Sequence, residues 1–218
     1  MTLQTMIEQL SGGMLNSMGI FFLTLIFSLP LGLVIAFGRM SRIKIISIPT
    51  NVLISILRGT PLMLQLMVWY FFPYYLFKMP IADWRFPAII VGFSINYAAY
   101  FAEIYRTGIE AIPKGQYEAS TILGYKKFQT FTKKIFPQVI RIIMPSITNE
   151  VITLVKDTSL AFSLNYLEMF AIAKQIAARE TTLMPFVAAA IFYYIFNLIV
   201  TIVMGKIVKS LKRHEREV

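Results

Sequence analysis

Cysteine is absent from this chain of 218 residues, and histidine occurs once, at His214. Thiol chemistry is therefore excluded, and a single histidine in a basic tail is explained by solvation rather than by a metal or catalytic site. Charge is also scarce, because only 15% of the residues are charged, whereas soluble domains average about 25%. We therefore expect no catalytic residues and no metal or cofactor bound by this chain.

Charged residues are missing altogether from four long stretches, at 12–38, 59–77, 86–102 and 181–205. A hydrocarbon core about 30 Å thick is crossed by about 20 helical residues, so stretches of this kind indicate transmembrane helices. The sequence therefore predicts an all-α membrane protein in which residues 1–218 form one transmembrane domain. We expect five spans, at 17–38, 51–77, 86–106, 139–156 and 184–205.

The basic residues predict the orientation of these spans. Lys and Arg number 21, against 11 Asp and Glu. If the N-terminus lies outside, most of the 21 fall in the inner segments, as the positive-inside rule requires. We therefore expect the N-terminus outside and the C-terminus inside. The net charge of +10 is then explained by the basic residues that set this topology, and not by a nucleic-acid-binding surface. Glu8 is the only charge before residue 39, so a cleavable signal peptide is not expected.

The second span is interrupted. Pro61 lacks a backbone N–H and disfavours helical angles at Thr60, while Gly59 adds conformational freedom. Arg58 lies directly before this break. Irregular backbone at membrane depth occurs only against protein or water, so the break is expected to face the interior of the bundle.

Polar side chains follow one face of the third span. Asn96, Tyr100 and Glu103 are spaced by four and three residues, which places them on one side of a helix. An intramembrane carboxylate usually faces a cavity, but Glu103 also lies near the inner end, where pairing with Arg106 would explain it. Both interpretations stay open. In the fourth span, Asp157 is expected at a helix end within the membrane, followed by a partly re-entrant segment.

A basic stretch without a spanning run occupies residues 107–137. Two short apolar stripes are expected there, with Gly124 ending the first helix and Pro137 ending the second. The first stripe comprises Ala119, Ile122 and Leu123, and the second comprises Phe128, Phe131 and Ile135. Such a basic helix–turn–helix on the inner side could lie on anionic lipid or bind a soluble protein, and these residues alone do not decide between the two.

The same stretch resembles the EAA loop of bacterial ABC importer permeases. Glu118, Ala119, Gly124 and Pro137 match its spacing, although Ser120 replaces a second alanine. Lys134 and Phe136 also depart from the pattern. Four further segments, RGTPLMLQL, AEIYRTGIEAIPKGQYEAS, FPQVIR and KDTSL, are similar to the permeases of the polar amino acid uptake group.

This resemblance implies a type I ABC importer permease fold with about five transmembrane helices and a cytoplasmic coupling helix, at about residues 110–138. It implies cytoplasmic ATP-binding subunits that hold ATP and Mg, an extracytoplasmic amino acid-binding protein, and a second permease copy, identical or related. It also implies a place in the bacterial inner membrane. The absence of a Walker A motif in the chain agrees with ATP hydrolysis on a partner. The residues implied to contact the ATPase are Glu118, Ala119, Ser120, Gly124 and Pro137.

A substrate site is expected where the broken helix meets the third and fourth spans, because broken helices offer oriented backbone groups. Polar amino acids, including basic ones, are the implied substrates. The expected lining residues are Arg58, Thr60, Pro61, Gln65, Asn96, Tyr100, Glu103 and Asp157. A structural ion network of Arg58, Glu103 and Asp157 is the competing interpretation. The alternative function is a secondary transporter or channel without an ATPase, whereas a membrane enzyme would need a catalytic cluster that the sequence lacks.

Overall fold

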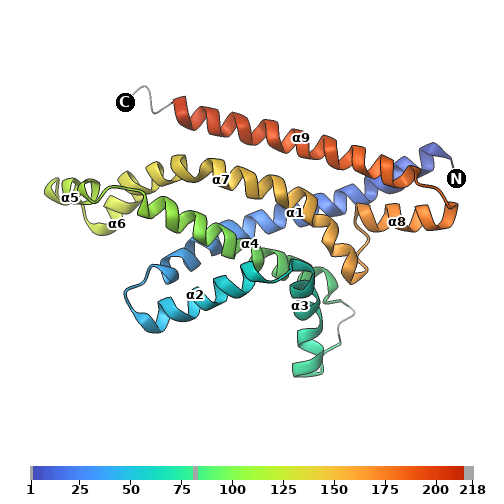
Figure 1. The fold of residues 1–218 in the computed structure, drawn as a ribbon, viewed down its shortest axis with the longest axis horizontal. Coiled ribbons are helices and arrows are strands. Elements are labelled where there is room, and N and C mark those ends of the chain that lie inside the picture. Colours follow the sequence, from blue (N-terminus) through green and yellow to red (C-terminus); the bar gives the residue numbers. More distant parts are fainter. Residues whose placement is uncertain (1, 81–82, 214–218) are drawn as a thin grey trace.

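The computed structural model of this chain describes residues 2–80 and 83–213, so the prediction for His214 lies outside the described residues. The described residues are helical, with short connections and no strand. Figure 1 shows an elongated bundle with the two chain ends at opposite ends. The helices are α1 (Leu3–Arg39), α2 (Lys44–Gly59), α3 (Leu62–Phe77), α4 (Arg85–Glu110), α5 (Lys114–Ile122), α6 (Lys127–Thr130), the π-helix η1 (Phe131–Ile135), α7 (Phe136–Asp157), the 3₁₀-helix η2 (Thr158–Leu164), α8 (Met169–Glu180) and α9 (Met184–Arg213).

The prediction of about five spans is confirmed as four long helical stretches and one bent pair. Among the described residues, the stretches that are long and apolar enough to cross a membrane are Leu3–Arg39, Arg85–Glu110, Lys127–Leu164 and Met184–Leu211. The fifth candidate joins α2 and α3, whose axes meet at 114° across a short break. The predicted interruption of the second span is therefore present, and it is a sharp bend.

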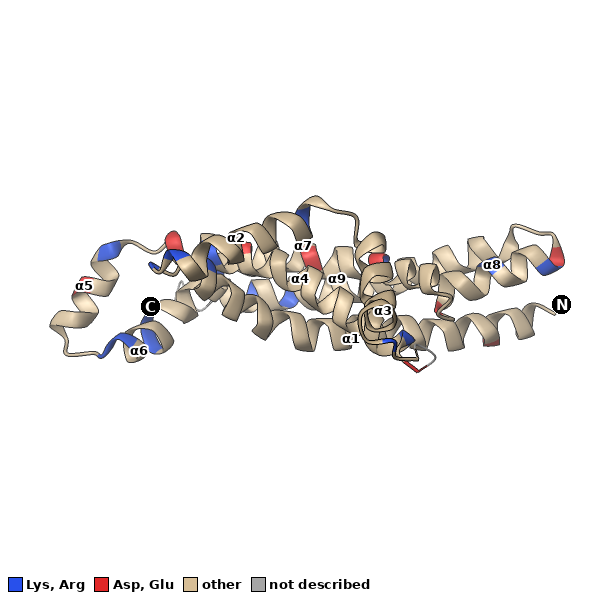
Figure 2. Cartoon of the chain, turned by 90° about the horizontal axis from the view of Figure 1, so that it is seen from below, with Lys and Arg blue, Asp and Glu red and all other residues tan. Residues whose placement is uncertain are grey.

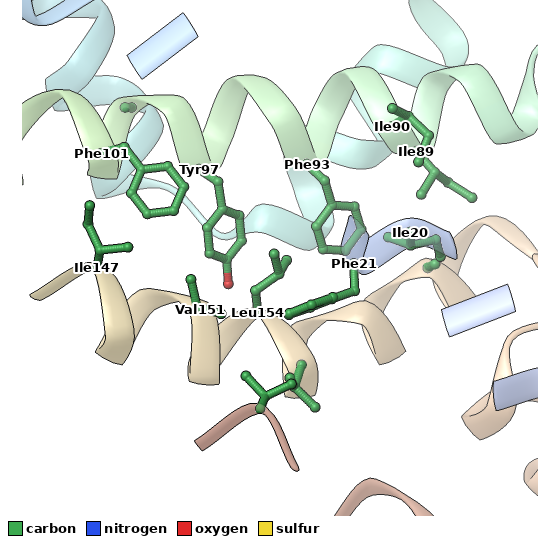
Figure 3. Close-up of a cluster of buried hydrophobic side chains, with 14 of the residues drawn as sticks. Ile20, Phe21, Ile89, Ile90, Phe93, Tyr97, Phe101, Ile147, Val151 and Leu154 are labelled. Atoms are coloured by element: carbon green, nitrogen blue, oxygen red, sulfur yellow. The ribbon is translucent and has the colours of Figure 1, made fainter. Parts of the chain in front are cut away.

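The core is built around α4. Its central side chains Phe93, Tyr97 and Phe101 are almost fully buried against α1 and α7 (Figure 3). Small residues let the helices approach closely, since Gly32 of α1 faces Phe101 without a side chain between them. Many large apolar side chains of α1 and α9 are exposed instead, as expected of helices that face lipid.

A buried carboxylate joins three helices at the end of the bundle that carries the N-terminus. Glu168 is fully buried and caps α8, where it accepts hydrogen bonds from the backbone N–H groups of Phe170 (2.8 Å) and Ala171 (2.6 Å). The hydroxyl of Tyr193 on α9 donates a third bond at 3.0 Å, and Ser17 on α1 lies 3.5 Å away. Burial raises the pKa of the Glu168 carboxyl, and these four donors oppose the shift.

Replacing Glu168 by alanine should destabilise the protein by about 1–3 kcal/mol, because the α8 cap is lost and buried donors lose their acceptor. Thermal unfolding of the detergent-purified protein measures this. Glu8→Ala, at an exposed position, is the matched control and should leave the midpoint unchanged. Glu168→Gln should recover part of the loss, and equal midpoints for Glu168→Ala and Glu8→Ala would contradict the prediction.

The pH dependence of the same variants has a defined sign. Because the pKa of Glu168 is raised, the folded protein holds this proton more tightly than the unfolded chain. The free energy of unfolding therefore falls as the pH rises from the ordinary glutamate pKa toward the raised one. Glu168→Gln should remove this component of the pH profile.

The first helix of the basic stretch ends as predicted. Gly124 has a positive φ of 78°, which glycine adopts at little cost. Its N–H donates to the carbonyl of Thr121, and the N–H of Tyr125 donates to the carbonyl of Ser120, both at 3.0 Å. These two bonds form a Schellman motif, which satisfies the last carbonyl groups of α5.

The second half of the stretch departs from the prediction. Ile135 is fully buried and Phe131 packs edge-on against Phe37, 5.3 Å between ring centroids, but Phe128 is 77% exposed and does not join their stripe. Phe128 lies on α6, before the π-helix that carries Phe131 and Ile135. Pro137, which was predicted to stop or kink the helix, does not stop it, because it is the second residue of α7 and that helix continues to Asp157.

Candidate functional site

The break between α2 and α3 is held by side chains that replace the missing helical hydrogen bonds. The amide of Gln65 donates to the carbonyl of Leu57 at 2.9 Å and to the carbonyl and hydroxyl oxygens of Thr60 at 3.1 and 2.8 Å. Asn96 of α4 donates to the same Leu57 carbonyl at 3.1 Å and to the Gln65 side chain at 3.0 Å. Carbonyl groups freed by Pro61 are thereby satisfied in the buried interior.

These bonds give Gln65 and Asn96 a structural role beside their predicted role in substrate binding. Gln65 is 9% exposed and Asn96 is 4% exposed. Asn96 also lines the cavity described next, whereas Gln65 lies behind it. Both keep the backbone at Thr60 and Pro61 in a fixed position against α4.

A cavity of about 460 Å³, here called the carboxylate cavity, opens on one side of this break. Two of its side chains are acidic and none is basic. It is lined by Thr60, Pro61, Leu62, Asn96, Tyr97, Tyr100, Glu150, Thr153, Asp157 and Leu160. Five of the residues predicted to bind substrate therefore line the carboxylate cavity, namely Thr60, Pro61, Asn96, Tyr100 and Asp157.

The carboxylates of this cavity both come from α7. The hydroxyl of Tyr97 donates to Asp157 at 2.7 Å, which fixes that carboxylate against α4. Glu150 and Thr153 were not among the predicted residues. Glu150 lies two helical turns before Asp157, so the seven-residue spacing was the signal that would have placed the two carboxylates on one face.

A second cavity of about 600 Å³, here called the arginine cavity, lies on the other side of the break. It is lined by Arg39, Asn51, Ile54, Ser55, Arg58, Gly59, Tyr100 and Glu103. The charges that the sequence suggested would converge are thus divided between two cavities. Arg58 and Glu103 line this one, while Asp157 lines the carboxylate cavity.

Glu103 is held by two guanidinium groups. Arg106 donates to it from Nε at 3.0 Å and from a terminal nitrogen at 2.8 Å, and Nε of Arg39 lies 3.4 Å away. Arg39 is on α1, so the carboxylate joins α1 to α4. The predicted pairing with Arg106 is present, and within the described part of the chain no ion pair joins Arg58 to Glu103 or Asp157.

The predicted coupling residues lie at the opposite end from the N-terminus. Glu118, Ala119 and Gly124 are exposed, whereas Ser120 is buried and donates to the carbonyl of Gln116 at 2.8 Å. Pro137 is exposed at the start of α7. Large apolar side chains are also exposed at this tip, namely Ile122, Leu123 and Phe128. Figure 2 shows Lys and Arg gathered around α5 and α6.

These features are typical of a membrane transport protein. The helices are apolar, one span is broken, polar cavities lie beside the break, and a basic segment projects from the bundle. Residues 28–213 match the family described as the inner membrane component of binding-protein-dependent transport systems. The chain therefore belongs to this family and is a multi-pass protein of the inner membrane. It is the permease, the transport subunit of an ABC transporter, as the sequence predicted.

Curated relatives cover most of the chain. The L-cystine transport system permease protein TcyB of Bacillus subtilis is 35% identical over 94% of this chain and 87% of its own length. The octopine transport system permease protein OccM of Rhizobium radiobacter is 37% identical over 80% of this chain and 76% of its own length. A putative glutamine transport system permease protein of Rickettsia bellii is 34% identical over 87% of this chain and 86% of its own length.

Solved structures agree with this assignment. An amino acid ABC transporter crystallised with histidines has a TM-score of 0.83 and 28% identity, covering 96% of this chain and 99% of its own. An inward-facing methionine ABC transporter has a TM-score of 0.77 at 18% identity, which supports the fold. The type I importer permease fold is confirmed, and the comparisons favour the ABC importer over a secondary transporter or channel.

Proposed function

We propose that this permease forms the translocation pathway of an ATP-driven importer of polar amino acids, including basic ones. The observation that carries this proposal is the carboxylate cavity, where Glu150 and Asp157 face a space with no basic lining residue. Every amino acid carries an ammonium group, which two carboxylates attract, and a basic side chain adds a second cation. The relatives named for cystine, glutamine and octopine transport support the same substrate class.

The proposal assigns the energy source to partner chains. Two cytoplasmic ATPase subunits bind ATP and Mg, and an extracytoplasmic binding protein delivers the amino acid. A second permease, identical or related, completes the pathway. The exposed tip of α5 and α6 supports a docking role, because its apolar side chains and Gly124 are open to a partner. The gathering of basic residues at this end supports a cytoplasmic C-terminus and an external N-terminus (Figure 2).

Reconstitution of the complete importer in proteoliposomes tests the proposal. Vesicles receive radiolabelled L-glutamine, L-cystine or L-arginine together with the cognate binding protein, with ATP on the ATPase side. We expect accumulation of at least one of these amino acids only when both ATP and the binding protein are present. Accumulation that proceeds without either one would contradict the importer assignment.

A substitution inside the cavity tests the substrate site separately. Glu150→Gln keeps the shape of the side chain and removes one of the two charges that face the cavity. We expect L-arginine transport to fall more than L-glutamine transport, because only the former carries a second cation. Thr153→Val at the same cavity is the uncharged control. An equal loss for both substrates in Glu150→Gln would contradict a role of this charge in selection.

A further inference from the structure

The two cavities meet at a single side chain. Tyr100 lines both the carboxylate cavity and the arginine cavity, and it is the one residue common to the two linings within the described part of the chain. The broken helix divides in the same way, because Arg58 and Gly59 line the arginine cavity while Thr60 and Pro61 line the carboxylate cavity. The boundary between the cavities therefore runs through the break and the Tyr100 ring.

Arg58 lies on this boundary. The central carbon of its guanidinium group is 5.2 Å from the centroid of the Tyr100 ring, within the range of a cation–π contact. The neighbouring carboxylate of Glu103 is already held by Arg39 and Arg106. The ring, which lines both cavities, is therefore the partner that positions the Arg58 side chain within the arginine cavity.

We infer that Arg58 and Tyr100 form a gate between the carboxylate cavity and the arginine cavity. This inference rests on the proposed function, because it takes the two cavities as successive parts of one substrate path. With the guanidinium on the ring, the boundary is closed to an amino acid by the bulk of the two side chains. Displacement of Arg58 from the ring opens the way into the arginine cavity.

The surroundings confine this movement to side chains. The far side of the break is fixed, since Thr60 is bonded to Gln65 and Gln65 to Asn96. Apart from its chain neighbours, Gly59 has nothing within 4 Å of where a side chain would begin, so the backbone is uncrowded on that side of the break. The carboxylate cavity, which shares Tyr100 with the arginine cavity, contains the acidic groups of Glu150 and Asp157. A single cation–π contact is weak enough to break and re-form in each transport cycle.

Efflux from proteoliposomes that contain the complete importer tests the gate. The vesicles are loaded with whichever of L-glutamine, L-cystine and L-arginine the wild type accumulates, and efflux is followed without ATP and without binding protein. We expect little efflux from the wild type. Arg58→Met and Tyr100→Ala should each raise it about tenfold, equivalent to about 1.4 kcal/mol in favour of the open gate.

Three controls make the result specific. Tyr100→Phe keeps the ring face and should leak less than Tyr100→Ala. Tyr74→Ala removes a cation–π contact at the other end of α3, where Nζ of Lys78 lies 5.9 Å from the Tyr74 ring, and should stay near wild type. Trapped sucrose should be retained in all variants. The double variant of Arg58 and Tyr100 should leak no more than either single one, because both remove the same contact.

The outcomes separate this inference from the proposed function. If the wild type accumulates no amino acid with ATP and binding protein, the proposed function fails. If the wild type accumulates amino acid and Arg58→Met and Tyr100→Ala leak no faster, the gate is overturned. Loss of sucrose together with the amino acid also overturns it, because the membrane and not the gate has then been opened. A misfolded variant loses uptake without gaining efflux, so an increase in efflux is not a consequence of misfolding.

Discussion

Replacing Gly124 by valine should reduce the substrate-stimulated ATP hydrolysis of the assembled importer by about tenfold or more. The backbone at Gly124 has a φ of 78°, and a β-branched residue is strained there by about 1–3 kcal/mol. The Schellman bonds that end α5 depend on this conformation. Their loss changes the course of the chain at the tip that is proposed to bind the ATPase.

Two matched variants distinguish conformation from bulk. Gly115→Val places the same side chain in the same segment, where the backbone angle is ordinary and no neighbour lies within 4 Å, and should be nearly neutral. Gly124→Asn should retain much of the activity, because asparagine tolerates the left-handed conformation. ATP hydrolysis and co-purification of the ATPase with the permease are the measurements. Wild-type values for Gly124→Val would refute the assignment of this turn to coupling.

Replacing Gly32 by alanine should destabilise the transmembrane bundle by about 1–3 kcal/mol through overpacking. A side-chain carbon at Gly32 would lie 2.8 Å from Cβ of Phe101 and 3.1 Å from the carbonyl oxygen of Ala98. One of these atoms is a Cβ and the other is a backbone oxygen, so neither can move away by a change of side-chain rotamer. The two helices that build the core would have to separate.

The same substitution elsewhere on α1 provides the control. Gly19 has no neighbour within 4 Å of its missing side chain, so Gly19→Ala should stabilise the helix by about 0.5–1 kcal/mol. The two variants are therefore expected to shift the thermal unfolding midpoint in opposite directions. Equal shifts would show that helix propensity, and not the close approach of α1 and α4, decides the effect.

Local chemistry in the sequence was sufficient for the features that depend on a few adjacent residues. The charge-free stretches predicted the spans, Thr60 and Pro61 predicted the break, and Gly124 predicted the end of α5. Each of these follows from hydrophobicity or from the backbone properties of proline and glycine. None requires knowledge of what lies opposite in space.

Features that depend on distant partners could not be predicted in the same way. Glu103 pairs with Arg39, which lies 64 residues earlier, and no local pattern indicates that contact. The division of the polar residues between two cavities likewise depends on how α2 is bent against α4. The predicted stripe at Phe128 was wrong because an amphipathic pattern does not show which apolar side chains find a packing partner, and Phe128 is 77% exposed.

The π-helix between α6 and α7 determines the direction in which the exposed tip of α5 and α6 projects. A π-turn contains one residue more than an α-turn, so the five residues Phe131–Ile135 absorb one extra position without breaking the helix. One residue corresponds to about 100° of rotation around an α-helix. Removing a residue from the π-helix would leave α7 and its carboxylates in place and would rotate the exposed tip about the helix axis. The number of residues between Gly124 and Pro137 therefore sets the direction in which the tip proposed to bind the ATPase projects from the bundle.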